Sequence, residues 1–468
     1  MMKKILAFTS ALLMAAASMS LTSCSSKESS SSSSEDYSDA DVAADVREKI
    51  KDAALESDLL PDEELENKTI KWFANWDINP DSTGKTKPIE LVLFEEKYHG
   101  KIEYVQIKDW NQRYEELSTK MLAGDGIDFF WGGDKDAIPR GALSDVFVPT
   151  DDYIDYDSPL WEDVKDLNDR YKWGDDHYLA LVQATGDNVG CIYNRKTMEE
   201  AGLDDPADLY AQGKWDWNAF ESMLQKFVDV DNQRYGVDGW WFQSAFMGTT
   251  GVPGITLEDG KLVDNLGDPA MERVQNFMFD IHKIGGVAVG EGDYGWEVHP
   301  EYVGEGKMLF YPVGLYELYK EPEQWKKIYG DDAFFVPMPK DPDADDYYIP
   351  VGMEAYTFIK GGANPQGVAR FLDCKRFSRL NEDTRKLGDE QFRNDYGWTD
   401  EMVDMQNEMQ RLADENPVID FSLAVNDDCS TILDNELRAS SHGTPWNETY
   451  DKISAQVEAL IDDANGKK

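Results

Sequence analysis

Residues 188–203 read NVGCIYNRKTMEEAGL and predict a strand that runs directly into a helix. The apolar run at 189–193 is typical of a strand that is buried on both faces. The helix is expected to begin near Arg195 and to end at Gly202, because glycine readily adopts the left-handed backbone conformation that closes a helix. Residues 177–182 predict another strand just upstream.

Strands and helices alternate over much of the remaining chain. The first part predicts strand, helix, strand, helix, strand and then a helix or turn, at residues 69–76, 88–98, 101–107, 109–123, 127–131 and 137–147. Farther along, helices are expected at 217–228, 269–284 and 365–377, strands at 237–242, 307–311, 333–338 and 356–359, and a mostly helical C-terminal remainder. Such alternation is typical of an α/β fold with a parallel sheet that carries helices on both faces.

The N-terminus carries an export signal. Lys3 and Lys4 precede an apolar stretch at 5–19, and residues 21–24 read LTSC before a run of serines. This segment resembles the lipobox of bacterial lipoproteins, which implies cleavage before Cys24 and acyl chains, such as palmitate, on the new N-terminus. An ordinary signal peptide with an incidental cysteine is the alternative.

The lipobox interpretation divides the N-terminal part of the chain. We expect a signal peptide at 1–23 and a lipidated cysteine with a flexible Ser-rich and acidic tether at 24–68. The apolar stretch is too short to span a bilayer, so the mature protein is expected to be lipid-anchored at the cell membrane, on the extracellular or periplasmic side.

The composition argues against several classes of protein. Lys and Arg number 46 against 92 Asp and Glu, which gives a formal net charge of −46. So acidic a chain argues against nucleic-acid binding, which needs basic side chains to displace counterions. The five histidines lack the spacing of a metal site, and we expect neither a metal nor a cofactor.

The cysteines and one acidic turn leave alternatives open. Cys191 lies in the apolar run at 189–193 and is expected to be a buried free thiol, although one bridge among Cys191, Cys374 and Cys429 also fits the sequence. Residues 229–236 faintly resemble a calcium loop but lack a third acidic ligand and the terminal Glu. A helix-to-strand turn is the favoured interpretation of that segment.

Four segments in a fixed order carry a family resemblance. They are FEEKYHGKIEYV at 94–105, the stretch from Trp110 to AGDGID at 123–128, the quoted segment at 188–203, and FFVPMP at 334–339 followed by Gly352, FIKG and Asn364-Pro. Together they resemble the family 1 extracellular solute-binding proteins of bacterial ABC transporters, over roughly 400 residues from Thr69 onward.

The resemblance implies a fold and a function. The fold would be the two-lobe, type II periplasmic-binding-protein architecture, with lobe 1 at 69–185 plus 331–377, lobe 2 at 188–330 plus 378–468, and a ligand cleft between them. The lobes would close on a carbohydrate, such as an oligosaccharide, and deliver it unchanged to membrane permeases. Gly186 would suit a hinge crossing whose dihedral angles must change. We expect a monomer with no catalytic activity.

Aromatic and acidic residues follow several predicted strands. Sugars present apolar C–H faces and hydroxyl groups, so rings and carboxylates suit them, and ligands of open α/β sheets gather at the carboxyl ends of strands. Strand alternation would place either Trp240 or Trp241 in the cleft. The candidate ligand-binding residues are Trp76, Trp110, Trp131, Asp134, Asp187, Trp240, Trp241, Trp296, Tyr311, Tyr316 and Glu354.

Other functions remain as alternatives. A secreted glycoside hydrolase would need two carboxylates that flank a bond, but with 92 acidic residues any such pair is uninformative. Adhesins and carbohydrate-binding modules are usually all-β, which the alternation here is not. A peptide or polyol in place of the sugar also fits the sequence.

Overall fold

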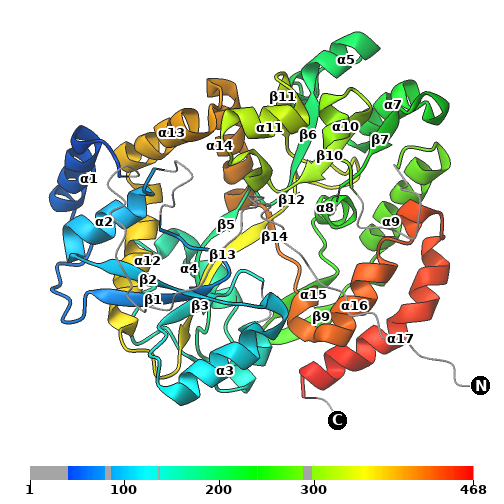
Figure 1. Cartoon of the computed structure of the whole chain (residues 1–468). Coiled ribbons are helices and arrows are strands. Elements are labelled where there is room, and N and C mark those ends of the chain that lie inside the picture. Colours follow the sequence, from blue (N-terminus) through cyan, green and yellow to red (C-terminus); the bar gives the residue numbers. More distant parts are fainter. Residues whose placement is uncertain (1–40, 80–85, 135–136, 240, 288–297, 467–468) are drawn as a thin grey trace, which may run out of the picture.

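The computed structural model of the chain describes residues 41–79, 86–134, 137–239, 241–287 and 298–466. Two separate sheets dominate it, and short links connect them (Figure 1). The first sheet has the strand order β2-β1-β3-β13-β4, with β5 also paired to β13, and the second has the order β11-β6-β10-β7. The α/β expectation is confirmed.

The first sheet contains both parallel and antiparallel strand pairs. β1 runs parallel to β2 and β3, as the alternation predicted, whereas β13 runs antiparallel to β3, β4 and β5 and returns from much later in the chain. Its strands are β1 (Thr69–Ala74), β2 (Lys101–Gln106), β3 (Phe129–Trp131), β4 (Phe147–Val148), β5 (Ala180–Thr185) and β13 (Gly352–Ile359).

The second sheet is mixed. β10 runs parallel to β7 and antiparallel to β6, and β6 runs antiparallel to β11. We call the first sheet with its covering helices the first lobe, and the second sheet with its covering helices the second lobe. The remaining strands are β6 (Gly190–Asn194), β7 (Tyr235–Val237), β10 (Met308–Val313) and β11 (Ala333–Val336), with the small pairs β8 (Ile255–Glu258) and β9 (Lys261–Asp264), and β12 (Ile349–Pro350) and β14 (Pro417–Val418).

Helices account for most of the remaining described chain. The α-helices are α1 (Ala44–Glu56), α2 (Ile89–Tyr98), α3 (Arg113–Ala123), α4 (Glu162–Arg170), α5 (Arg195–Ala201), α6 (Pro206–Ala211), α7 (Trp217–Phe227), α8 (Phe242–Gly248), α9 (Pro269–Lys283), α10 (Glu301–Gly304), α11 (Pro322–Tyr329), α12 (Pro365–Leu380), α13 (Glu382–Tyr396), α14 (Asp400–Glu415), α15 (Ser422–Val425), α16 (Asp427–Glu436) and α17 (Trp446–Ala464). Short turns of helix are η2 (Trp110–Gln112), η3 (Ala137–Gly141), η4 (Val230–Asn232), η5 (Leu315–Leu318) and η6 (Ser440–His442).

Alternation along the strands puts large rings on both faces of the first sheet. Trp72 and Phe129 face α12, where Phe129 lies 6.0 Å from Phe371. Their strand neighbours face the opposite way, and Phe130 lies 5.7 Å from Tyr114 of α3. Helices therefore cover both faces of this sheet, as predicted.

Several sequence predictions are confirmed in detail. Gly202 ends α5 in the left-handed conformation, as expected; α3 ends in the same way at Gly124. Cys191, Cys374 and Cys429 are buried free thiols. The segment at 229–236 is the helix-to-strand turn, in which the Asp229 carboxylate accepts hydrogen bonds from Asn232.

The strand predicted at 237–242 is wrong. β7 already ends at Val237, and Gly239, with φ 145°, lies in the segment after it. α8 then begins at Phe242, and all of its residues except Ser244 are buried, so the segment does not show the alternation of a half-buried strand. The strand-alternation argument for Trp240 and Trp241 therefore no longer applies, and Trp240 lies outside the described residues.

Folded structure begins earlier than the tether prediction for residues 24–68 allowed. α1 lies against α2, with Ile50 and Ala54 almost fully buried between them. Arg47 bonds Glu96 of α2 at 2.7 Å. Ile50 and Ala54 lie on one face of α1, and the burial of that face depends on α2, which supplies the partner surface.

The lobe boundaries also differ from those expected. Because β11 pairs with β6, residues 333–336 belong to the second lobe and not to the first. α13 packs on α12 and α2 of the first lobe, although 378–468 was assigned to the second. The chain therefore returns to the first lobe between β11 and β13, through β12.

Burial of α1 can be tested by substitution. Ile50→Asp would place a charge in an apolar contact and should destabilise the first lobe by about 3 kcal/mol or more, as measured by urea unfolding. Lys49→Asp introduces the same side chain at an exposed position of the same helix and should have little effect. Equal stability of the two variants would mean that α1 is not part of the folded lobe.

Candidate functional site

The segment that connects β5 to β6 lies at the carboxyl ends of strands from both sheets. β5 ends at Thr185, which pairs with Gly352 at the start of β13. Residues 186–189 lead to Gly190, which opens β6 and pairs with Val313 at the carboxyl end of β10. Four residues reach at most about 17 Å between their neighbours, so residues that follow β1, β3, β7 and β10 gather around this crossing.

α14 holds the crossing from one side. The amide of Gln410 accepts a hydrogen bond from the Gly186 N–H at 3.2 Å and donates one to the Ala184 carbonyl at 2.8 Å. A Cβ on Gly186 would lie 2.3 Å from the Met409 carbonyl oxygen. Glycine at 186 is therefore needed for close approach of a helix, a different reason from the dihedral freedom that the sequence suggested.

Three predicted tryptophans meet at the carboxyl edge of the first sheet. The Trp76 ring lies 5.4 Å from Trp131 and 6.2 Å from Trp110. Tyr356 of β13 lies 5.6 Å from Trp131, edge to face, and Trp72 lies 5.4 Å from Trp76. Trp76 is 37% exposed, which makes it the most accessible ring of this group, and Trp110 and Trp131 are partly buried. We call the group the first aromatic cluster.

Polar groups border the first aromatic cluster. The indole N–H of Trp131 donates to Asp134 at 3.3 Å, so these two predicted residues are joined. The Arg113 guanidinium lies 4.8 Å from the centre of the Trp110 ring and donates to the Trp110 carbonyl. A ring platform therefore lies beside one carboxylate and one guanidinium.

The second sheet contributes a smaller group at the same crossing. Trp241 lies 6.2 Å from Tyr316, edge to face, and Tyr316 is 39% exposed. The backbone carbonyl of Asp187 accepts a hydrogen bond from the N–H of Leu315, which places the crossing beside Tyr316. We call Trp241, Tyr316 and Asp187 the second-lobe group.

Asp187 is held by one of its oxygens. The Tyr319 hydroxyl donates to Oδ2 at 2.7 Å, and Gln406 of α14 in turn donates to that hydroxyl at 2.9 Å. Oδ1 takes no hydrogen bond from any residue that the structure describes, so this oxygen remains an unused acceptor within the described part of the protein.

Two predicted residues do not join the site. Tyr311 lies within β10, not at its end, and is 3% exposed against Tyr329, so it is a core residue. Glu354 is 8% exposed and belongs to a buried ion cluster. Trp296, like Trp240, lies outside the described residues.

Both oxygens of Glu354 are engaged. Oε1 lies 2.7 Å from Lys375 Nζ and accepts a hydrogen bond from the Tyr356 hydroxyl at 3.1 Å, while Oε2 accepts one from Arg379 at 2.5 Å. Lys375 also bonds Glu90 of α2 at 2.7 Å. Through Tyr356 this ion cluster supports the first aromatic cluster without contacting its accessible ring.

The charge of Glu354 is stabilised by its neighbours. Burial by itself would raise the pKa, but the positive charges of Lys375 and Arg379 outweigh burial and lower the pKa of Glu354 to about 2. The pKa of Lys375 is in turn held above its usual range by Glu354 and Glu90 despite burial.

Sequence reasoning missed Tyr356 and Tyr319. Both support predicted site residues from positions distant in sequence, Tyr356 beside Trp131 and Tyr319 beside Asp187. Tyr356 lies inside an apolar strand, where its pattern is that of core, and no signal in the sequence pairs it with Trp131. Tyr319 follows Tyr316 in an aromatic-rich stretch, which was the available signal.

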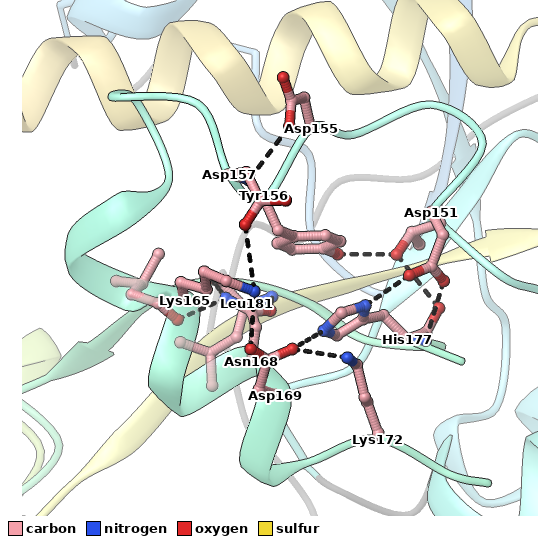
Figure 2. A network of polar contacts seen from close by, with 12 residues as sticks. Asp151, Asp155, Tyr156, Asp157, Lys165, Asn168, Asp169, Lys172, His177 and Leu181 are labelled. Carbon is pink, nitrogen blue, oxygen red and sulfur yellow. Dashed lines mark hydrogen bonds and ion pairs between the residues drawn. The ribbon is translucent and has the colours of Figure 1, made fainter. Parts of the chain in front are cut away.

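A further polar network lies at the amino end of β5, away from the crossing (Figure 2). His177 is buried, with Nδ1 2.6 Å from Asp151 and Nε2 3.1 Å from Asp169, and its ring stacks on Tyr156 at 4.1 Å. Both ring nitrogens are thus engaged, and the network fastens the loop before α4 to β5. No three His, Cys, Asp or Glu side chains in the described part of the chain could hold a metal ion.

Comparisons with known proteins agree with the two-lobe α/β fold. A family model described as bacterial extracellular solute-binding protein matches residues 76–374. The search of curated proteins found no match.

Solved structures share the fold. The cyclic α-maltosyl-1,6-maltose binding protein of Arthrobacter globiformis has a TM-score of 0.62 at 14% identity, over 84% of this chain and 99% of that one. The ABC-transporter-associated binding protein of B. animalis subsp. lactis, in complex with β-1,6-galactobiose, has a TM-score of 0.55 at 15% identity over 86% and 98%. UgpB of Mycobacterium tuberculosis, in complex with glycerophosphocholine, has a TM-score of 0.58 at 18% identity over 85% and 99%.

The ion cluster around Glu354 predicts a pH dependence. The pKa of Glu354 is lowered from the ordinary 4.5 to about 2. The ionised Glu354 therefore stabilises the fold above about pH 4.5, and this stabilisation is lost as the pH falls toward 2. Glu354→Gln should destabilise the protein at pH 7 by about 2–4 kcal/mol, and by less near pH 2, in urea unfolding.

Substitution of an exposed glutamate is the control for substitution of the buried Glu354. Glu382→Gln breaks an exposed pair with Lys386 on α13 and should leave stability nearly unchanged at either pH, because solvent screens such pairs. If the Glu354 variant showed the same small and pH-independent effect, the buried cluster would not stabilise the fold.

Proposed function

The chain belongs to the family of bacterial extracellular solute-binding proteins, and we propose that it is the receptor of an ABC importer that captures a carbohydrate between its two lobes. The family implies an exported protein that binds a solute. The proposal adds the class of solute, the residues that contact it and the anchor that holds the protein at the membrane.

One observation carries the proposal. Among the described residues, Trp76 and Tyr316 are the only aromatic side chains with more than about a third of their surface exposed. They lie on different lobes, and each follows a strand whose carboxyl end reaches the crossing. Exposed rings on both sides of a hinge suit a ligand with two apolar faces.

The chemistry of a sugar fits these side chains. The C–H face of a pyranose packs on a flat ring, and its hydroxyl groups donate to carboxylate oxygens. Asp134 beside Trp131 and Asp187 beside Tyr316 supply those acceptors. An oligosaccharide would use both groups when the lobes close.

The proposal includes release of an unchanged solute. Asp134 and Asp187 would act as hydrogen-bond acceptors, with no proton transfer or nucleophilic step assigned to them. The solute would then pass to permease subunits in the membrane, with the protein acting as a monomer.

The anchor rests on the N-terminal sequence. Within the described part of the chain, every helix is too short or too polar to cross a membrane. Lipidation of Cys24 would hold the protein at the cell surface, and since α1 packs on α2, the first lobe would be the one joined to the tether.

A ligand panel tests the solute. Thermal shift and calorimetry against maltotetraose, β-1,6-galactobiose and glycerophosphocholine should give micromolar or tighter binding of an oligosaccharide, recovered intact, since a ligand at 100 times Kd adds about 2.7 kcal/mol to stability. Trp76→Ala and Tyr316→Ala should each lose about 1–3 kcal/mol of binding free energy, by analogy with stacking of bases on aromatic rings.

A control variant and two alternative outcomes complete the ligand panel. Leu122→Ala removes an apolar side chain that is 91% exposed on α3 and should leave binding unchanged. Tight binding of glycerophosphocholine alone would replace the carbohydrate with a polyol phosphate, and shorter sugar products would indicate a hydrolase.

Substitution of Cys24 tests the anchor. The wild-type protein should sediment with membranes and be released by detergent, whereas Cys24→Ala should appear in the soluble fraction or as uncleaved precursor. A wild-type protein found free in the medium, with an N-terminus other than Cys24, would show an ordinary signal peptide.

A further inference from the structure

We propose that Gly314 is a positioning residue whose missing side chain makes the space in which the Tyr316 ring is seated. The inference rests on the proposed function for its effect on binding, but the seating of the ring is a property of the unliganded protein. It concerns the loop that joins β10 to η5 in the second lobe.

The backbone of Gly314 does not require glycine. Its φ is −58° and its ψ is 136°, a conformation that every residue type adopts easily. At such a position, replacement of glycine by alanine normally stabilises a protein, because it restricts the unfolded chain. Conformational freedom therefore does not explain glycine at 314.

The Tyr316 ring supplies the explanation. A Cβ on Gly314 would lie 2.3 Å from Cε1 and 2.5 Å from Cδ1 of that ring, and 3.1 Å from the Asn188 carbonyl oxygen. One edge of the ring thus occupies the volume that a side chain at 314 would take. Trp241 meets the ring edge to face, while 39% of the Tyr316 surface remains exposed.

The first lobe repeats the arrangement. A Cβ on Gly133 would lie 2.2 Å from Cζ2 of Trp131, and Gly133 follows Trp131 by two residues, just as Gly314 precedes Tyr316 by two. Each lobe therefore seats one site ring on a glycine. Gly133 is the less informative position to test, because its Cβ would also lie 2.4 Å from the Met353 carbonyl oxygen.

A methyl group at 314 has a specific consequence. Ordinary contact with Cε1 begins near 3.4 Å, so the ring edge must move by more than 1 Å or the loop must shift. Because the ring is the exposed aromatic surface of the second-lobe group, its displacement misplaces the face on which a sugar would pack.

A double-mutant cycle without ligand tests the seat. In the full-length chain, Gly314→Ala should lower the melting temperature, whereas in a Tyr316→Ala background the same change should leave it equal or raise it, because the space is then empty. Gly388→Ala on α13, where a Cβ meets no atom within 4 Å, is the control and should not lower it. A fall of equal size in both backgrounds would overturn the proposal.

Binding provides the second readout. With the oligosaccharide of the panel that binds the wild-type protein most tightly, Gly314→Ala should weaken binding at least tenfold, and it should add no further loss to Tyr316→Ala. Wild-type affinity of Gly314→Ala, or equal losses in both backgrounds, would show that Gly314 does not act through the ring. If no oligosaccharide binds the wild-type protein, the proposed function fails. The melting temperatures of the double-mutant cycle then test by themselves whether Gly314 makes space for the Tyr316 ring.

Discussion

The short crossing from β5 to β6 is the constraint on which the candidate site depends. Only residues 186–189 separate the two strands, so the carboxyl edges of both sheets must lie close to the same segment. α14 fixes that segment through Gln410, and Glu408 bonds Tyr210 of the second lobe at 2.6 Å. The crossing thus determines which strand ends meet, and the side chains that follow those ends form the candidate site.

Trp76 and Tyr316 are more exposed at these edges than the other aromatic rings of the described chain. Trp72, Phe129 and other large rings are buried, and burial of such a side chain contributes about 1.5–3 kcal/mol. Trp76 and Tyr316 give up part of that contribution by staying exposed at the crossing. Their neighbours hold the two rings in place by edge-to-face packing, so each presents a preformed surface.

Carboxylates near the site divide into two roles that burial distinguishes. Glu354 is enclosed with Lys375 and Arg379, and both of its oxygens are occupied, so it stabilises the sheet beneath the first aromatic cluster. Asp187 is bound through one oxygen and keeps the other as an acceptor. The ion cluster therefore supports the rings, while Asp187 is the carboxylate that the proposed function assigns to the solute.

The sequence by itself determined the α/β class, the ends of helices such as α2, α5, α7 and α9, and the placement of Trp76 and Trp131 after neighbouring strands, because period, glycine caps and strand ends are local signals. It did not determine that Tyr311 is core, that Glu354 is paired or that α1 is folded. Those outcomes depend on Tyr329, Lys375 and α2, which lie far away in sequence. Only the tertiary structure decides them, because burial and ion pairing belong to surfaces that meet after the chain has folded.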